Sequence, residues 1–557
     1  MQIEPAGQQN ASLRSPLIGS EAADGSQLEE RLGSLTVAAT RKPPFLLPIV
    51  FVSGMSEMAI QMCASRLIQP FFGSSLLIWA NLIGFTMICL TLGYFIGGRL
   101  GDRFPRPTIL YLLTGAAAIT MALTPLISEP VLKVVTDSTK GIESGGLFIG
   151  SMAGIIILFT LPMLIAGCVS PFAVRLLLHN VQGAGRTAGT VSSLSTVGSI
   201  LGTFLPVLWI MPAIGTRATM YLFAAVLLLF SVIGLIVARR DPSFGTAATA
   251  DANKQPQEIE QKAAETSYEQ TEPIQTPFLL PIVFICGMAV MAVEMSASRL
   301  IQPYFGDSLL IWACLIGFII IYLAIGYALG GRLADRFPRP GFLYQLAGLA
   351  AFAIGLIPAI SNPILTIANE GFKTVNGGLF FGSLMGIVLL FSVPVILLGC
   401  VTPFAVRLLM HSVQGAGRTA GKVSAVSTFG SIVGTFLPVL LFIPLVGTRS
   451  TLYIFSLVLL AFASVGLLWV NRRRAPVFAA MLVLVLVMAA FVTFKIKSAP
   501  YGTLLYEKES AYNYIQVVQR DNSKQVDLVL NEGHAVHSIY NPDTVLTNGP
   551  WDYFMVT

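Results

Sequence analysis

Charged residues are scarce in this chain, and so are the side chains that most often ligate metals. Only 11% of the 557 residues are charged, whereas an average soluble domain has about 25%. The 6 cysteines lie within or beside apolar runs, and no two of them form a C-x-x-C motif. These absences argue against a disulfide framework or a zinc site. We expect the cysteines to be packing residues of a polytopic membrane protein.

The basic residues are not arranged as a nucleic-acid surface. The formal net charge is +6, but the lysines and arginines fall in short loops between apolar runs and form no stripe with aromatic residues. We therefore expect no nucleic-acid partner. We interpret these residues as signals that orient membrane spans, with the lipid bilayer as the partner of the chain.

The N-terminal segment lacks the basic start and apolar core of a signal peptide. Residues 1–43 are polar and are expected to be a disordered cytoplasmic tail. Apolar runs long enough to cross about 30 Å of hydrocarbon then occur in two groups of six, within residues 44–240 and 277–474. The polar, acidic stretch 241–276 between the groups is expected to be a flexible linker.

The two groups are copies of one another. ASRLIQPFFG and GGRLGDRFPRP in the first group reappear as ASRLIQPYFG and GGRLADRFPRP in the second. Asp102 and Asp335 lie 233 positions apart, and Arg175 and Arg407 lie 232 apart, so the duplication extends through the group. An even number of spans per copy predicts parallel repeats related by an axis along the membrane normal.

Basic residues follow the even-numbered spans of both copies, for example Arg103 and Arg336. Lysine and arginine are retained on the cytoplasmic side, so we expect a multi-pass protein of the cell membrane with a cytoplasmic N-terminus. A further uncharged run within 475–497 predicts a thirteenth span, which places residues 498–557 outside the cytoplasm. The alternative is that this run lies along the membrane or re-enters it.

Glycines recur at four-residue spacing inside the spans, as in Gly198 and Gly202 or Gly430 and Gly434. This spacing clears one helix face and predicts close helix contacts. The GAGRTAG stretches at 183–189 and 415–421 do not have the spacing of a phosphate-binding loop and follow membrane helices, so we interpret them as turns.

Two glutamates lie inside the first span of their copies, at positions that are not equivalent. Glu57 corresponds to Val290, and Glu294 corresponds to Gln61, so the carboxylate has moved by four residues. Residues four apart share one helix face, and each copy therefore presents one acid on the same stripe.

Ionisable residues inside a span are costly, and they are usually paired or functional. We expect each of these carboxylates to form an ion pair with an arginine of the other copy, Arg66 or Arg299. Such pairs would tie the copies together. A proton or substrate relay is the alternative interpretation of Glu57 and Glu294.

The composition changes after residue 498. TLLYEKESAYNYIQVVQR and QVDLVLNEGHAVHSI alternate apolar and polar residues, and DNSKQ between them is rich in turn formers. The expected fold is therefore an all-α polytopic membrane protein of two tandem six-span repeats and a thirteenth span, followed by a short β-hairpin segment. The apolar face of these strands is expected to lack a covering domain; it includes Ile515, Val517, Leu528 and Leu530.

Several motifs resemble the membrane-fused spermidine synthase-like family. ESAYNYIQVV, LVLNEGHAVHSIYNPD and WDYF resemble the start of a polyamine aminopropyltransferase domain, while ASRLIQPYFG and GYALGGRLADRFPRP resemble the membrane region of that family. The resemblance implies a transferase of polyamine biosynthesis, with decarboxylated S-adenosylmethionine as co-substrate and a polyamine or another small molecule as substrate. Residues 498–557 would then be the N-terminal β-part of a spermidine synthase-like domain.

By that resemblance, the candidate substrate-binding residues are Tyr512, Asn513 and His537. Asn513 and His537 stand where that family has glutamines, and Tyr553 stands where it has a carboxylate. The segment after residue 498 has only isolated glycines and no glycine-rich nucleotide site. The chain as it stands is therefore expected to hold no cofactor or metal, to contain no catalytic residues and to be inactive.

GGRLGDRFPRP also resembles the loop after the second helix of major facilitator transporters, and two parallel six-span copies fit that architecture. The alternative function is therefore a major facilitator-like transporter with a non-catalytic appendage that binds a polyamine or a nucleotide. A membrane scaffold with neither activity is a third possibility.

Overall fold

The computed structural model describes most of the chain from residue 45 onward. The described residues are 45–73, 75–142, 146–178, 183–240, 278–306, 308–372, 378–410, 415–491, 497, 499–510, 513–531, 536–547, 549 and 552–553. Within them, 12 helices are long and apolar enough to cross a membrane. The expected polytopic helical bundle with six spans per repeat is confirmed.

The first repeat runs from α2 to α9. Its helices are α2 (Leu46–Phe72), α3 (Leu76–Arg103), α4 (Pro107–Thr139), α5 (Gly146–Gly167), α6 (Val169–Leu177), α7 (Ala184–Leu205), α8 (Met211–Ile214) and α9 (Thr216–Arg240), with a π-helical turn at Pro206–Ile210. Glycine and proline set the boundaries: Gly73 with φ of 80° follows α2, and Pro107 is the first residue of α4.

The second repeat has the same order of elements. Its helices are α12 (Leu279–Phe305), α13 (Leu309–Arg336), α14 (Pro340–Gly371), α15 (Gly378–Gly399), α16 (Val401–Leu409), α17 (Ala416–Leu437), α18 (Ile443–Val446) and α19 (Thr448–Val470), with a π-helical turn at Pro438–Phe442. Even the π-helical turns recur 232 positions apart, because the duplicated sequence begins each of them with a proline.

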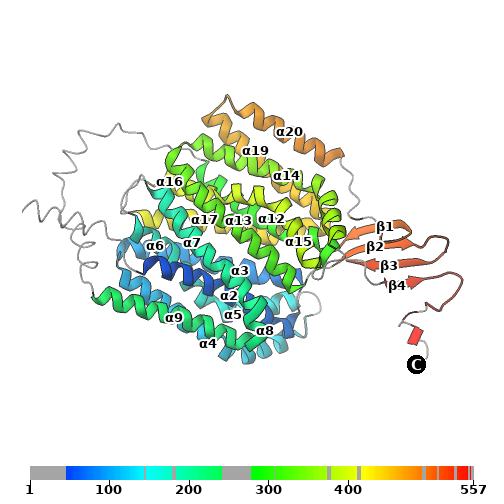
Figure 1. Ribbon diagram of the computed structural model, residues 1–557, viewed down its shortest axis with the longest axis horizontal. Coiled ribbons are helices and arrows are strands. Elements are labelled where there is room, and N and C mark those ends of the chain that lie inside the picture. Colours follow the sequence, from blue (N-terminus) through cyan, green and yellow to red (C-terminus); the bar gives the residue numbers. More distant parts are fainter. Residues whose placement is uncertain are drawn as a thin grey trace, which may run out of the picture.

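The two repeats form one bundle because the second and fifth long helices of each pack against the other repeat. α3 packs along α17, and α13 packs along α7. In Figure 1 the helices of both halves run roughly parallel, with the C-terminal strands at one end. We call the end where α3 and α13 finish the arginine end, and the opposite end the tryptophan end.

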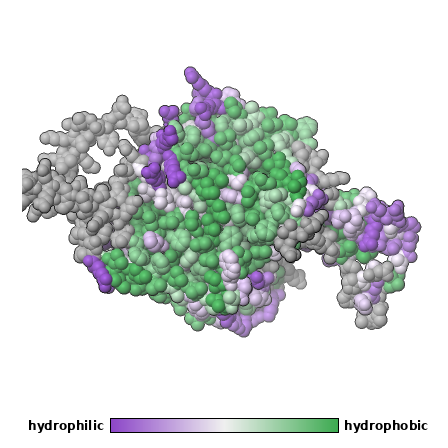
Figure 2. Space-filling model, in the orientation of Figure 1, coloured by the Kyte–Doolittle hydropathy of each residue, from purple (hydrophilic) through white to green (hydrophobic). Residues whose placement is uncertain are grey.

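The surface of the bundle agrees with a bilayer environment. Large apolar side chains are exposed along many helices, including Leu126, Leu161, Leu229 and Trp469. Figure 2 shows a hydrophobic side face, with hydrophilic residues gathered mainly toward the ends and on the strands. Such a face would be unstable in water, but it is suited to lipid.

The four-residue glycine spacing produces backbone contacts, as expected. A Cβ atom at Gly198 would overlap the Phe51 carbonyl oxygen, and one at Gly202 would overlap that of Met55. Both contacts join α7 to α2, and Gly430 and Gly434 repeat them between α17 and α12. Without any side chain in between, the two helices approach until their backbones touch.

Gly202→Ala is expected to destabilise the bundle by about 1–3 kcal/mol, the range for an overpacked core. The added methyl group has no space beside the Met55 carbonyl. Thermal unfolding of the purified protein in detergent measures the effect. Gly371→Ala is the matched control, because a Cβ atom there would meet nothing within 4 Å. Equal melting temperatures for the two variants would contradict this packing.

Helix α20 (Ala475–Phe491) follows the second repeat and lies beside α19 and α14. Phe478 contacts the Gly348 position and Val485 the Gly355 position, so α20 runs alongside α14 away from the arginine end. Its 17 residues span about 25 Å, shorter than the 12 long helices. α20 therefore leads the chain to the tryptophan end, where the strands begin.

The C-terminal segment forms one antiparallel sheet in the order β1-β2-β3-β4, as the alternating pattern predicts. The strands are β1 (Thr503–Glu509), β2 (Tyr514–Gln519), β3 (Val526–Leu530) and β4 (Val536–Tyr540). Each pairs with its sequence neighbour, with register shifts in the β1–β2 and β3–β4 pairs. The segment is thus a four-stranded meander and not a single hairpin.

The two faces of the sheet differ in burial. Ile515, Val517, Leu528 and Leu530 are only half-buried, whereas the opposite face is buried through Tyr514, Gln516, Val518, Asp527 and Val529. The polar members of that face have partners. The Tyr514 hydroxyl donates to Glu507 over 2.8 Å, and the Gln516 amide donates to the Lys497 carbonyl over 3.0 Å.

Asp527 is fully buried in the sheet and accepts hydrogen bonds from Arg520, Tyr501 and Gln525 at 2.7, 2.7 and 2.8 Å. Burial raises the pKa of its carboxyl group, but the three donors together hold that pKa below its ordinary value. In turn, burial and the bond to Asp527 raise the pKa of Tyr501 to about 12.

A lowered folded-state pKa of Asp527 means that its ionised form stabilises the sheet above the unfolded pKa of about 3.9. This contribution is lost as the pH falls through the lower, folded value. Hydrogen exchange of residues 526–530, corrected for intrinsic rates, is expected to show loss of protection below about pH 4. Asp527→Asn should weaken this pH dependence, while Asp543→Asn, at an exposed pair with Lys524, should leave it. Identical profiles for the protein and Asp527→Asn would contradict the assignment.

Candidate functional site

A cavity of about 230 Å³ lies between the two repeats near the middle of the bundle. It is lined by α2, α3 and α7 from the first repeat and by α12, α13, α15 and α17 from the second. An adjoining space of about 130 Å³ shares several of the same side chains. We refer to the two together as the central cavity.

The central cavity is acidic. Glu57 and Glu294 both line it, and no lysine, arginine or histidine is among its lining residues. Glu294 is 7% exposed and Glu57 is half-buried. Gln61 and Val290, which are their equivalents in the other repeat, line the cavity too. Because positions 57 and 61 share a helix face, moving the acid by one turn has kept it in the same cavity.

The other polar lining residues come in equivalent pairs. Tyr94 and Tyr327 lie 233 positions apart on α3 and α13, and they reach the cavity from opposite halves. Most of the remaining hydroxyl groups come from serines and threonines of α7 and α17, which are Ser192, Ser195, Thr196, Ser199, Ser424, Ser427, Thr428 and Ser431. Other helices add Ser53, Thr86, Ser170 and Thr402. Sequence analysis missed all of these residues, because single hydroxyl groups in a span carry no distinctive pattern.

The expected ion pairs between these glutamates and Arg66 or Arg299 are not formed. In the described part of the chain, no cationic side chain lies within 4.0 Å of either carboxylate, and neither accepts a hydrogen bond. Both arginines lie at the tryptophan end of their helices, more than a turn beyond the cavity. Arg299 instead donates to Gln302 over 2.9 Å and to the Ser510 carbonyl over 3.1 Å.

Two aspartates join the halves at the arginine end. Asp102, at the end of α3, accepts hydrogen bonds from the backbone N–H groups of Gly417 and Arg418 over 3.0 and 2.7 Å. These groups belong to the first turn of α17 in the other repeat, where a carboxylate satisfies unpaired N–H groups and the helix dipole. Arg175 lies 3.5 Å from the same carboxylate.

The mirror contact has the same geometry. Asp335 accepts from Gly185 and Arg186, in the first turn of α7, over 3.1 and 2.8 Å, and Arg407 lies 3.5 Å away. The interpretation of the two GAGRTAG stretches as turns was wrong, because all but the first residue of each belongs to the start of α7 or α17. Each helix start receives an aspartate from the opposite repeat. Sequence analysis noted both motifs without connecting them, since the contact spans 149 or more positions.

At the tryptophan end the halves meet through aromatic rings. Trp79 near the start of α3 stacks on Trp312 near the start of α13, with ring centroids 4.9 Å apart and planes inclined by 10°. A 28-residue helix such as α3 is about 40 Å long, so this pair and Asp102 lie at opposite ends. The halves are thus in contact on both sides of the central cavity.

Asp335→Ala is expected to loosen the arginine end, because the first turn of α7 loses the acceptor that ties it to α13. The native thiol of Cys286 lines the central cavity and is 3% exposed. Its modification by a membrane-impermeant methanethiosulfonate, measured by peptide mass spectrometry, should become several-fold faster, and more so in Asp102→Ala/Asp335→Ala. Asp137→Asn, at an exposed pair with Lys140, is the control. Unchanged rates in the double variant would contradict a closing role for these aspartates.

The residues proposed for substrate binding in the C-terminal segment do not form a described site. Tyr512 lies outside the described residues. Asn513 stabilises the β1–β2 turn, where its N–H donates to Ser510 Oγ over 2.9 Å and its side-chain oxygen accepts from Asn531 over 2.9 Å. His537 is exposed on β4 beside Ser538. In the described residues, no group of three or more His, Cys, Asp or Glu side chains is placed to hold a metal ion.

Two similar halves with a cavity between them are the architecture of secondary transporters built from parallel six-helix repeats. A family model described as Major Facilitator Superfamily matches residues 46–435, which is more than half of the chain. The chain belongs to the Major Facilitator Superfamily.

Two solved transporters are similar in structure. A bacterial homologue of the iron transporter ferroportin, in an outward-facing state with soaked iron, shares 14% identity; the match covers 77% of this chain and 100% of that one, with a TM-score of 0.46. The human organic anion transporter MFSD10 (TETRAN) shares 17% identity, with coverages of 76% and 99% and a TM-score of 0.37. No curated protein matches the sequence.

The assignment to the spermidine synthase-like family was wrong. The family match places the membrane region in the Major Facilitator Superfamily and gives no evidence of an aminopropyltransferase. Of the motifs that carried the resemblance, those of the membrane region lie within the matched residues, where GGRLADRFPRP supplies Asp335 to the contact between halves. The alternative, a major facilitator-like transporter, is the function that these findings support.

Proposed function

We propose that this protein is a secondary transporter that carries a small cationic solute through the central cavity. One observation carries the proposal: Glu57 and Glu294 reach the same cavity from opposite halves, and its lining contains no basic side chain. A carboxylate in such a place is costly unless a positive charge accompanies it. A cationic group held between the halves supplies that charge, and the surrounding hydroxyl groups supply hydrogen bonds.

Transport follows from the contacts on either side of the cavity. Opening the arginine end requires Asp102 and Asp335 to release the helix starts that they cap, while the tryptophan end stays closed through Trp79 and Trp312. Opening the tryptophan end requires the reverse. Because each contact joins one repeat to the other, the halves can rock as rigid bodies around the bound solute.

The arginine end is assigned to the cytoplasm, since Arg103, Arg240 and Arg336 lie there. With α20 running to the opposite end, this orientation places the sheet outside the cytoplasm of a cell-membrane protein. The Cys286 modification tests this assignment when it is repeated in vesicles of known orientation. The faster reaction of Asp335→Ala should then require the reagent on the cytoplasmic side.

The test of transport uses proteoliposomes on a solid-supported membrane, where an entering cation produces a transient current. The probes are methylammonium, tetramethylammonium, 1,4-diaminobutane and sodium, each as the chloride. For the probe that produces a current, Glu57→Gln and Glu294→Gln should each lower the apparent affinity about 30-fold. This is the change expected when a buried charge partner worth about 2 kcal/mol is lost. Glu370→Gln changes an exposed acid at the end of α14 and should have no effect.

The duplicated helix face offers a sharper variant. Glu57→Gln/Gln61→Glu moves the acid of the first repeat to the position that Glu294 occupies in the second, and it should restore much of the current that Glu57→Gln loses. A variant that merely perturbs folding would not be rescued by moving the charge. Currents that persist in both single variants, or that arise with sodium acetate but not with sodium chloride, would overturn the proposal.

A further inference from the structure

The sheet is attached to the second repeat through a defined set of contacts. The Glu509 carboxylate accepts hydrogen bonds from the N–H and hydroxyl groups of Thr448, at the start of α19, over 2.6 and 2.7 Å. The next residue, Ser510, offers its carbonyl to Arg299 over 3.1 Å. Lys497 donates to the Pro303 carbonyl over 2.7 Å and lies over the Tyr304 ring.

The first repeat has the same surface without a sheet on it. Arg299, Pro303 and Tyr304 correspond to Arg66, Pro70 and Phe71, while Gly447, Thr448 and Arg449 correspond to Gly215, Thr216 and Arg217. All six of these first-repeat residues line a single groove of about 540 Å³, which we call the Arg66 groove. Thus the residues that hold the sheet in one repeat form an open depression in the other.

Exposure of the equivalent residues shows the difference. Arg299 and Arg449 are 5% and 7% exposed beneath the sheet, whereas Arg66 and Arg217 are exposed. A Cβ atom at Gly447 would lie 2.9 Å from Glu509, and one at Gly215 would meet nothing within 4 Å. Each of Arg299 and Arg66 also lines a smaller pocket, and Trp312 forms part of the wall of both.

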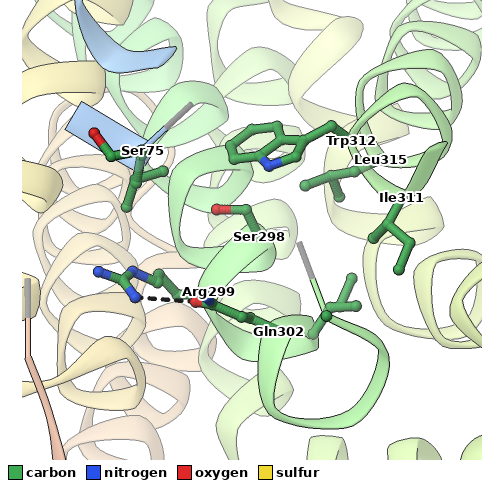
Figure 3. A pocket seen from close by; sticks show the side chains of 10 residues that line it. Ser75, Ser298, Arg299, Gln302, Ile311, Trp312 and Leu315 are labelled. Atoms are coloured by element: carbon green, nitrogen blue, oxygen red, sulfur yellow. Dashed lines mark hydrogen bonds between the residues drawn. The ribbon is translucent and has the colours of Figure 1, made fainter. Parts of the chain in front are cut away.

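The smaller pocket is also larger in the first repeat than in the second. The pocket beside Arg299 measures about 50 Å³, and that beside Arg66 measures about 260 Å³. Figure 3 shows the former, with Arg299 turned toward Gln302 and Trp312 on the opposite wall. In both size and exposure, the arginine of the first repeat is the accessible one.

One substitution changes the charge of this surface between the two copies. Asn362 stands where the first repeat has Glu129, and it accepts a hydrogen bond from Tyr304. Glu129 instead forms an ion pair of 2.9 Å with Arg217. In the second repeat the acids near Arg449 are Glu509 and Glu507, both from the sheet. The sheet therefore supplies Arg449 with acidic neighbours, because α14 has Asn362 where the first repeat has Glu129.

We propose that the Arg66 groove is a binding site for an acyl-glutamate unit, whether free or within a peptide. The contacts in the second repeat define this chemistry. The Glu509 carboxylate accepts a hydrogen bond from Thr448 at the start of α19, and the neighbouring Ser510 carbonyl accepts one from Arg299. Thr216 and Arg66 offer the same donors. The sheet of a second chain is not the expected occupant, because its Glu509 and Ser510 are engaged on its own second repeat.

The probes are N-acetylglutamate amide and the peptide acetyl-Leu-Tyr-Glu-Lys-Glu-Ser-amide, which repeats residues 505–510 of this chain. Saturation-transfer NMR at 150 mM NaCl measures their binding to the purified full chain in detergent. Saturable binding of either probe is expected, and binding of the peptide alone identifies a peptide segment as the ligand. Arg66→Ala should weaken binding at least tenfold, whereas Arg106→Ala, an exposed arginine at the other end of the bundle, should not.

Glu129→Asn provides a gain of binding that a merely structural role for Arg66 would not produce. It gives the first repeat the polar residue of the second and frees Arg217 from its ion pair, so binding should become several-fold tighter. Absence of saturable binding of both probes would overturn the proposal. So would equal losses in Arg66→Ala and Arg106→Ala, or loss in Arg299→Ala without loss in Arg66→Ala, which would place the probe on the second repeat.

Discussion

The architecture depends on carboxylates that cap helices across the boundary between the two repeats. Asp102 and Asp335 each satisfy two backbone N–H groups that the first turn of a membrane helix cannot pair internally. The helices can come this close because glycines line the contact: a Cβ atom at Gly98 would lie 2.5 Å from the Gly417 carbonyl oxygen, and the Gly331 and Gly185 pair is equivalent. These contacts hold the two repeats together at the arginine end, so they close that side of the central cavity.

Within this symmetric frame, the two sides of the central cavity differ most clearly in the position of the acids. The tyrosines and hydroxyl groups are duplicated, whereas one glutamate lies a helical turn further along than the other. On the proposed function, the two acids would contact different parts of the solute. A transporter that must hold a small molecule firmly and release it on the other side benefits from such unequal contacts, since no single arrangement of the halves satisfies both sides equally.

The sheet breaks the symmetry at the tryptophan end. It is held through Thr448, Arg299 and Pro303, all in the second repeat. The sheet is therefore attached to the second repeat, which carries Trp312. When the halves separate at this end, these contacts carry the sheet with the second repeat, and the Arg66 groove moves with the first.

The sequence by itself determined the membrane class, the duplicated six-span repeats, the helix contacts at glycine spacing and the antiparallel strands. Each of these follows from local composition or from periodicity, because such features depend on residues that are close together in the sequence. It also singled out Glu57, Glu294 and the arginines, because charge in a span is conspicuous. The protein family inferred from motif resemblance was wrong. Its membrane motifs include GGRLADRFPRP, which serves a helix end and a contact between the halves. Only the tertiary structure decided that the glutamates share a cavity without arginine partners, that Asp102 reaches Gly417 and Arg418, and which face of the sheet is buried. These facts depend on contacts between residues far apart in sequence, where the partner is set by how whole helices pack and not by neighbouring residues.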